Sequence, residues 1–274
     1  FSGDMMDKQN AESSCHDRYS PAATTIEPAL CCPVDYDAKW LKVIPQEVID
    51  CDYGCGDPSK YVREGETVLD LGSGAGKICF IASQVVGREG KVIGVDMNDS
   101  MLEVANKFAP VVAETIGYAN VEFHKGNIVD MRGIVEDNSI DVVVSNCVLN
   151  LVSNNEKPAL FEELFRVTIP GGRAVISDIV SNNVVPVEMQ EDDYLWSGCI
   201  SGAMKDDSFV EAFADAGFDE ITVVKHETEP WQTVNGIEFR SMTVVACKAD
   251  ESGNVDAGPT PDNNDCCCSS DGCC

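Results

Sequence analysis

Short apolar segments and longer amphipathic segments alternate along the middle of the chain. Each apolar segment has the length of a strand, whereas the segments between them have the period of helices. The expected strands are Thr67–Leu71, Lys91–Asp96, Val121–Lys125, Ile140–Ser145 and Arg173–Ile179. The expected helices end near Val86, Thr115 and Val167. Nearly continuous apolar strands that alternate with helices predict an α/β fold with a doubly wound, mostly parallel sheet.

The pattern changes after the last of these strands. A segment without a clear period covers about 180–205, and a helix is expected at Ser208–Ala216. Two β-rich runs, Glu220–Val224 and Phe239–Cys247, lie on either side of the turn-forming residues Glu229–Gly236. This arrangement predicts an antiparallel hairpin that closes one edge of the sheet.

Both ends of the chain differ from this pattern. Residues 1–30 are polar and lack a period, which predicts a flexible N-terminal lead. Residues 249–274 are rich in Asp, Gly, Pro, Asn and Cys, which is typical of a disordered acidic tail. We therefore expect a single folded domain at 31–248.

The charge of the chain restricts its partners. A formal net charge of −28, with only 19 Lys and Arg, would repel the phosphates of nucleic acids and of anionic membranes. No segment reaches the about 18 to 20 apolar residues of a membrane helix, and the first thirty residues lack the order of a secretory signal. We expect a soluble protein with no nucleic-acid or membrane partner.

The 14 cysteines indicate thiol chemistry. They are too sparse in a chain of 274 residues for a disulfide scaffold, and no Cys-x-x-Cys pair occurs. With only three histidines, a zinc-finger spacing is not assembled. His16, His124 and His226 are expected to be surface or capping residues.

A glycine-rich loop follows the first predicted strand and precedes a helix. It reads Asp70-Leu-Gly-Ser-Gly-Ala-Gly76, and Asp96 ends the next strand 26 residues after Asp70. Glycines let the backbone turn tightly and approach a ligand, while an acidic residue at this distance can accept hydrogen bonds from ribose hydroxyls. A dinucleotide site would show G-x-G-x-x-G instead of this D-x-G-x-G-x-G spacing.

The loop and the closing hairpin resemble motif I and the reversed seventh strand of the class I S-adenosylmethionine-dependent methyltransferases. The resemblance covers roughly residues 65–248. It implies a Rossmann-like sheet of seven strands and S-adenosyl-L-methionine as cofactor. The cofactor-binding residues would be Asp70, Gly72, Ser73, Gly74, Gly76, Asp96, Met97, Asn127, Ile128 and Asn146.

Three cysteines occur in segments that are predicted to be loops, namely Cys55, Cys147 and Cys199. Cys147 follows a strand, at the edge of the sheet where open α/β sheets bind their ligands. A single cysteine is usually a small buried hydrophobe, as we expect for Cys79 and Cys247. Three convergent thiolates, in contrast, would form a pocket for a soft cation.

Segments around these cysteines and the glycine loop resemble the arsenite methyltransferases, over about residues 31–205. The matching runs are Tyr53–Gly56, Leu69–Gly74, Gly94–Met97, Val144–Val148 and Gly198–Ala203. The resemblance implies methylation of trivalent arsenic, arsenite or methylarsenite, in arsenic detoxification. Two features depart from the family: Asp52 occupies the place of a usual Tyr, and the additional C-terminal domain of many members is not present in full.

The resemblance also implies roles for individual residues. Thiolates of Cys55, Cys147 and Cys199 would bind As(III), whose lone pair would attack the sulfonium methyl group without a general base. A disulfide between Cys55 and either Cys31 or Cys32 would return two electrons to arsenic. Glutathione or thioredoxin would reopen this disulfide, which implies a reducing, cytoplasmic location. The segment at about 180–205 would be an insertion at the acceptor site.

The tail ends in a cluster of cysteines for which three interpretations remain open. A metalloid-capturing arm is favoured over nonspecific heavy-metal binding, because soft thiol ligands raise the local ligand concentration near the site even when the tail is disordered. A prenylated terminus is the least favoured, because the tail lacks the basic residues that support such anchors. The cysteines are Cys266, Cys267, Cys268, Cys273 and Cys274.

Two other functions compete with arsenic methylation. The first is a small-molecule C- or O-methyltransferase in which the cysteines only pack. The second is a protein that sequesters metalloids on an inactive methyltransferase fold, against which the intact Asp70, Gly72, Gly74 and Asp96 argue.

Overall fold

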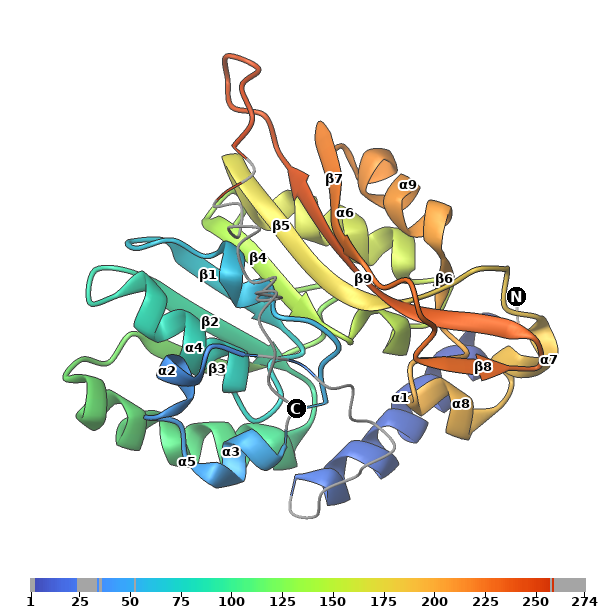
Figure 1. Ribbon diagram of the computed structural model, residues 1–274, viewed down its shortest axis with the longest axis horizontal. Coiled ribbons are helices and arrows are strands. Elements are labelled where there is room, and N and C mark those ends of the chain that lie inside the picture. The colour runs from blue at the N-terminus through green and yellow to red at the C-terminus, as the bar shows by residue number, and fades with distance from the viewer. Residues whose placement is uncertain (1–2, 24–33, 35, 52, 257, 259–274) are drawn as a thin grey trace, which may run out of the picture.

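The computed structural model describes residues 3–23, 34, 36–51, 53–256 and 258 (Figure 1). Within these residues, seven strands lie side by side in the order β3-β2-β1-β4-β5-β9-β7, while β6 pairs with β5 and β8 pairs with β9. The strands are β1 (Thr67–Leu71), β2 (Lys91–Asp96), β3 (Val121–Lys125), β4 (Ile140–Asn146), β5 (Thr168–Ser181), β6 (Met204–Lys205), β7 (Glu220–His226), β8 (Gln232–Val234) and β9 (Ile237–Cys247).

The directions of the strands agree with the apolar pattern. β1 to β5 run parallel to one another, so the predicted parallel core is confirmed. β9 is antiparallel to both β5 and β7, which confirms the closing hairpin. β5 is longer than expected because it begins at Thr168, directly after the preceding helix.

Helices cover both faces of the sheet (Figure 1). Val68 and Val142 pack with Phe80 on one face, whereas the next residues in sequence, Leu69 and Val143, pack with Phe161 on the other. Among the described helices, none is long and apolar enough to cross a membrane. The helices are α1 (Gly3–Ala22), α2 (Ala38–Leu41), α3 (Gln46–Asp50), η2 (Pro58–Tyr61), α4 (Lys77–Val86), α5 (Asp99–Ile116), η3 (Leu149–Leu151), α6 (Lys157–Val167), α7 (Val187–Gln190), α8 (Asp193–Ser197) and α9 (Asp206–Ala216).

The N-terminal segment differs from the expected flexible lead, because residues 3–22 form helix α1. Ala11 and Cys15 are buried against Trp196 of α8. Arg18 donates from Nη1 to the carbonyl of Tyr194 at 2.9 Å, and its guanidinium stacks on the Tyr194 ring. The helix has little amphipathic period of its own, so its contacts with a segment that lies far away in the sequence stabilise it.

The segment at about 180–205 is also more regular than its sequence predicted. It contains α7, α8 and β6, and Trp196 and Cys199 are buried within it. Elements of two to five residues carry too few positions to show a period, so their sequence predicted an irregular segment.

Candidate active site

A cavity of about 190 Å³ lies at the carboxyl ends of β1, β2 and β4. The chain passes from β1 outward to β2 and β3, then crosses to β4 on the other side of β1. Ligands bind in open α/β sheets at this kind of reversal, because the two connecting loops diverge there and leave a crevice. The glycine loop, residues of α1 and Cys147 all line this cavity.

The glycine loop presents bare backbone and an unpaired hydroxyl to the cavity. Gly74 has a φ of +51°, and a Cβ atom at this position would have no neighbour within 4 Å. The buried Oγ of Ser73 has no hydrogen-bond partner among the described residues. A buried polar atom without a partner is costly, so this hydroxyl is suited to a ligand group.

Two carboxylates lie beside the loop, of which Asp70 is buried and Asp96 is partly buried. Asp96 accepts hydrogen bonds from the backbone N–H groups of Gly74 and Asn98, both at 2.8 Å. Asp70 accepts one from the Cys79 thiol at 3.2 Å. Burial, together with the smaller effect of the nearby Asp96 charge, raises the pKa of Asp70 to about 7. A bound cation would favour the ionised carboxylate, so this part of the site fits the cationic, hydroxyl-bearing S-adenosylmethionine.

Most of the residues predicted to bind the cofactor line this cavity. The exception is Gly76, which precedes α4 with a φ of +90° and whose added Cβ would lie 2.6 Å from the Phe123 ring. Its role in the structure is therefore the turn and its packing. The nine that line the cavity are Asp70, Gly72, Ser73, Gly74, Asp96, Met97, Asn127, Ile128 and Asn146.

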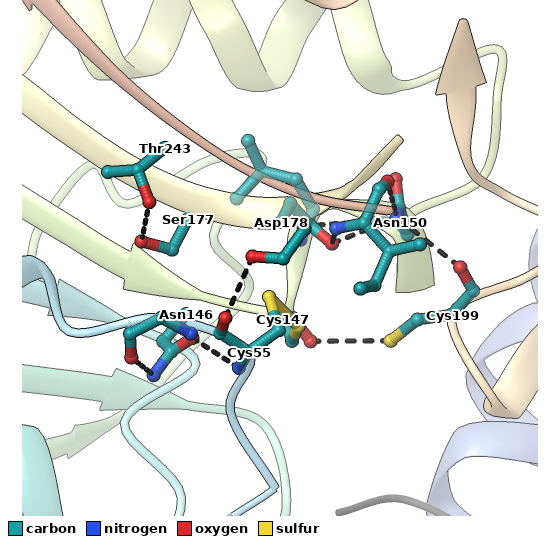
Figure 2. The surroundings of a disulfide bond; sticks show 12 residues. Cys55, Asn146, Cys147, Asn150, Ser177, Asp178, Cys199 and Thr243 are labelled. Carbon is teal, nitrogen blue, oxygen red and sulfur yellow. Dashed lines mark hydrogen bonds between the residues drawn. A yellow bond between two sulfur atoms is a disulfide. The ribbon is translucent and has the colours of Figure 1, made fainter. Parts of the chain in front are cut away.

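The three predicted arsenic-binding cysteines lie close together (Figure 2), and Cys147 is the one of them that lines the cavity. Cys55 and Cys147 form a disulfide with Cα atoms 5.9 Å apart, and the Cys199 thiol donates to the Cys147 carbonyl at 3.5 Å. Asn146 holds the loop of Cys55 in place, because its Oδ1 accepts from the N–H groups of Cys55 and Gly56 at 2.8 and 3.0 Å. Residues that are far apart in sequence are thus brought into one cluster.

The backbone of two of these cysteines is strained. Cys147 has a φ of +58° and Cys199 a φ of +61°. Non-glycine residues rarely adopt this left-handed conformation, which costs about 1 kcal/mol or more and is concentrated at functional sites. The conformation indicates that the surrounding contacts fix the direction of both side chains.

The disulfide joins different partners from those expected. Cys55 is bonded to Cys147, whereas Cys31 and Cys32 lie outside the described residues, as do Cys266, Cys267, Cys268, Cys273 and Cys274. In this oxidised form the described residues offer no group of three free His, Cys, Asp or Glu for a metal ion. Cys79 and Cys247 are buried in the core, as expected for packing residues.

Helix α1 contributes residues to the cavity that sequence analysis did not identify. Cys15, His16 and Tyr19 line it, as does Cys51. The Tyr19 hydroxyl is hydrogen-bonded to the Cys199 thiol, and burial raises the pKa of this tyrosine well above its ordinary value. No local signal could have placed these residues, because α1 reaches the cavity through contacts with segments that are distant in the sequence, such as α8 and Tyr53.

The fold and the cavity define the class of protein. A family model described as a methyltransferase domain matches residues 62–217. That range holds the glycine loop, the carboxylates of Asp70 and Asp96, and the reversal of strand order. The chain therefore contains an S-adenosylmethionine-dependent methyltransferase domain.

Particular relatives narrow this class. An arsenite methyltransferase of Halobacterium salinarum is 43% identical over 64% of the chain. One of Aquipseudomonas alcaligenes is 35% identical over 75% of the chain. The crystal structure of an arsenic(III) S-adenosylmethionine methyltransferase from Chlamydomonas reinhardtii matches with a TM-score of 0.72 and 32% identity, over 80% of this chain and 75% of that one. The chain belongs to the arsenite methyltransferase family. It spans 43% and 60% of the lengths of the Halobacterium and Aquipseudomonas relatives.

Proposed function

We propose that the chain methylates trivalent arsenic, arsenite or methylarsenite, as a step of arsenic detoxification. The observation that carries the proposal is the position of Cys147. It lines the same cavity as the glycine loop, is bonded to Cys55 and accepts a hydrogen bond from Cys199. A soft acceptor held by these three sulfurs would lie beside the cavity that Asp70 and Asp96 also line.

The cysteines act in the reduced form. Two electrons from a thiol reductant such as glutathione or thioredoxin convert the Cys55–Cys147 disulfide into two thiols, to which Cys199 adds the third. Three thiolates replace the oxygen ligands of arsenite and leave a lone pair on arsenic. Thiolate sulfur suits a soft cation better than oxygen does.

The transfer itself depends mainly on position. When bound, S-adenosylmethionine supplies an electrophilic sulfonium methyl group. The arsenic lone pair is the nucleophile, so no side chain has to remove a proton. The residues of this chain would hold the two reactants next to each other in one cavity, which converts a bimolecular reaction into an effectively unimolecular one.

Methylation raises arsenic formally from the trivalent to the pentavalent state. Two thiolates can return two electrons by forming a disulfide, which leaves methylated trivalent arsenic. The pair Cys55 and Cys147 is suited to this step because it already forms such a bond, and Cys31 or Cys32 remain alternative partners for Cys55. A reductant of the glutathione or thioredoxin class then reopens the disulfide, which is consistent with a reducing, cytoplasmic location.

The test is methylation of arsenite by the purified chain with labelled S-adenosylmethionine and excess thiol. We expect methylarsenic products from the wild type and a loss of about 100-fold in Cys147→Ser, as is typical when a ligand site is damaged. Cys247→Ser is the matched control, because Cys247 is buried in the sheet away from the cavity. Binding of S-adenosylhomocysteine without arsenic methylation would refute the proposal and favour a C- or O-methyltransferase.

A further inference from the structure

Behind the three cysteines lies a buried polar network that the reaction itself does not use. Its members are Asn150, Lys157 and Asp178, which are 1%, 4% and 0% exposed. Buried charged groups are costly unless they are paired and hydrogen-bonded, so their contacts indicate what they hold in place.

Asp178 lies on β5 and fixes the turn that follows Cys147 (Figure 2). Its carboxylate accepts hydrogen bonds from the backbone N–H of Leu149 at 2.9 Å, from that of Ile179 at 2.7 Å and from Asn150 Nδ2 at 2.8 Å. Burial raises the pKa of Asp178 to about 6, while these donors and Lys157 favour its ionised form. The carboxylate thus anchors the Cys147 turn to the sheet.

Asn150 connects this turn to the loop of Cys199. Besides Asp178, its Nδ2 contacts the carbonyl of Ile179 at 2.6 Å and that of Cys199 at 3.4 Å. The loop packs tightly against it, because a Cβ atom on Gly202 would lie 1.9 Å from the Asn150 carbonyl oxygen. One amide group therefore touches both cysteine-bearing segments.

Lys157 holds the same loop from the other side. Its ammonium group donates to the carbonyl of Gly202 and, at 2.7 Å, to Asn154 Oδ1. Lys157 is the first residue of α6, where the helix dipole disfavours a cation, and it is buried. Burial lowers the pKa of Lys157 to about 8, while the Asp178 carboxylate and, once ionised, the Cys199 thiolate favour the ammonium form. The two unfavourable features are partly compensated by hydrogen bonds that reach the Cys199 loop.

We propose that Asn150, Asp178 and Lys157 are positioning residues that keep the Cys199 thiol beside Cys147 when the Cys55–Cys147 disulfide is opened. In the oxidised form the disulfide itself ties Cys147 to Cys55, but no covalent bond ties Cys199 to either. Without the network, an acceptor would be held by two sulfurs instead of three. This inference rests on the proposed function of the three cysteines.

The experiment counts the sulfur ligands of bound arsenite in the reduced full-length chain by X-ray absorption at the arsenic edge. Asn150→Leu removes both amide donors at similar volume, and Lys157→Met removes the ammonium group. We expect three sulfur ligands in the wild type and two in each variant, with arsenite binding weakened about 10- to 100-fold. Lys157→Arg retains a cationic donor and should restore the third sulfur in part.

A control separates positioning from loss of stability. Glu66→Gln disturbs the buried pair with Arg173, whose atoms are 2.8 Å apart, in another part of the molecule. It should leave three sulfur ligands unchanged. If Asn150→Leu does not fold, Lys157→Met carries the test.

The outcomes distinguish the inference from the function on which it rests. Three sulfurs and unchanged affinity in the folded Asn150 and Lys157 variants would overturn the positioning role, whatever the activity of the wild type. Fewer than three sulfurs in the wild type would overturn the three-thiolate site and the positioning role together. Three sulfurs in the wild type without methylation would refute only the reaction.

Discussion

The side chain of Asn146 joins the end of β4 to the loop that carries Cys55, 91 residues away. Its Oδ1 accepts two backbone N–H groups, and its Nδ2 donates to the carbonyl of Gly56 at 2.7 Å. The fit requires glycine at position 54, because a Cβ atom there would lie 2.1 Å from Asn146 Nδ2. One amide therefore satisfies three backbone groups and sets the distance between Cys55 and Cys147.

Replacement of Asn146 by Ala should lower the stability of the folded chain. The backbone groups of Cys55 and Gly56 would lose their partners in a partly buried place, and each such loss costs about 1 kcal/mol or more. We expect the free energy of unfolding, measured in urea under reducing conditions, to fall by about 2 to 3 kcal/mol. Asn106→Ala, at an exposed site with one local hydrogen bond, should change it by less than about 0.5 kcal/mol. Equal effects of the two substitutions would contradict the role of Asn146.

Helix α1 acts as a wall of the cavity because it is packed on α8. Tyr19 contacts Tyr53 edge to face, with ring centroids 5.9 Å apart, and the Tyr53 hydroxyl donates to the Ala22 carbonyl at 2.9 Å. Contacts of this kind join α1 both to the loop before Cys55 and to the segment before Cys199. The helix thus lines the cavity next to both of these segments.

Arg18 of α1 donates hydrogen bonds to Tyr194 and Ser197 of α8, so Arg18→Ala should weaken the packing of α1 on α8. We expect amide hydrogen exchange in residues 11–23 to become about tenfold faster or more, because the lost contacts contribute on the order of 1.4 kcal/mol to local stability. Exchange in the central strands should not change. Asp17→Ala is the control, since Asp17 lies on the exposed side of the same helix. Unchanged exchange in Arg18→Ala would show that apolar contacts alone hold α1.

The molecule as a whole combines a net charge of −28 with carboxylates that are buried inside it. The mutual repulsion of surface charges decreases in salt, whereas the cost of burying a carboxylate does not. Burial raises the pKa of Asp70 to about 7 and that of Asp178 to about 6, both from an ordinary value of 3.8. Stability should therefore depend on pH near neutrality.

Proton binding to Asp70 determines whether the stability rises or falls with pH. Between pH 3.8 and about 7 the folded chain holds a proton on Asp70 that the unfolded chain lacks, so this stabilisation is complete at low pH and is lost as the pH rises through 7. We expect the free energy of unfolding, without cofactor and in high salt, to be about 1 kcal/mol larger at pH 6 than at pH 8. Asp70→Asn should reduce this difference. A difference that Asp70→Asn leaves unchanged would contradict the raised pKa of Asp70.

The positions of the strands, the glycine loop and the closing hairpin could be predicted because each produces a local pattern. A strand that is buried on both faces is a continuous apolar run, and a loop that approaches a ligand needs glycines at Gly72 and Gly74. The domain boundaries at 31–248 and the tail at 249–274 remain predictions. The helix at 3–22 was missed because its own sequence has almost no apolar period.

The residue types and the order of the elements were enough to indicate a methyltransferase with three cysteines in loops. Which sulfurs meet was decided by folding: Cys55 is bonded to Cys147 across 92 residues, and Cys199 reaches them through the network of Asn150, Lys157 and Asp178. Local periodicity reports which face of an element is buried, and it contains no information on which distant element covers that face. Contacts between distant segments arise only when the chain packs.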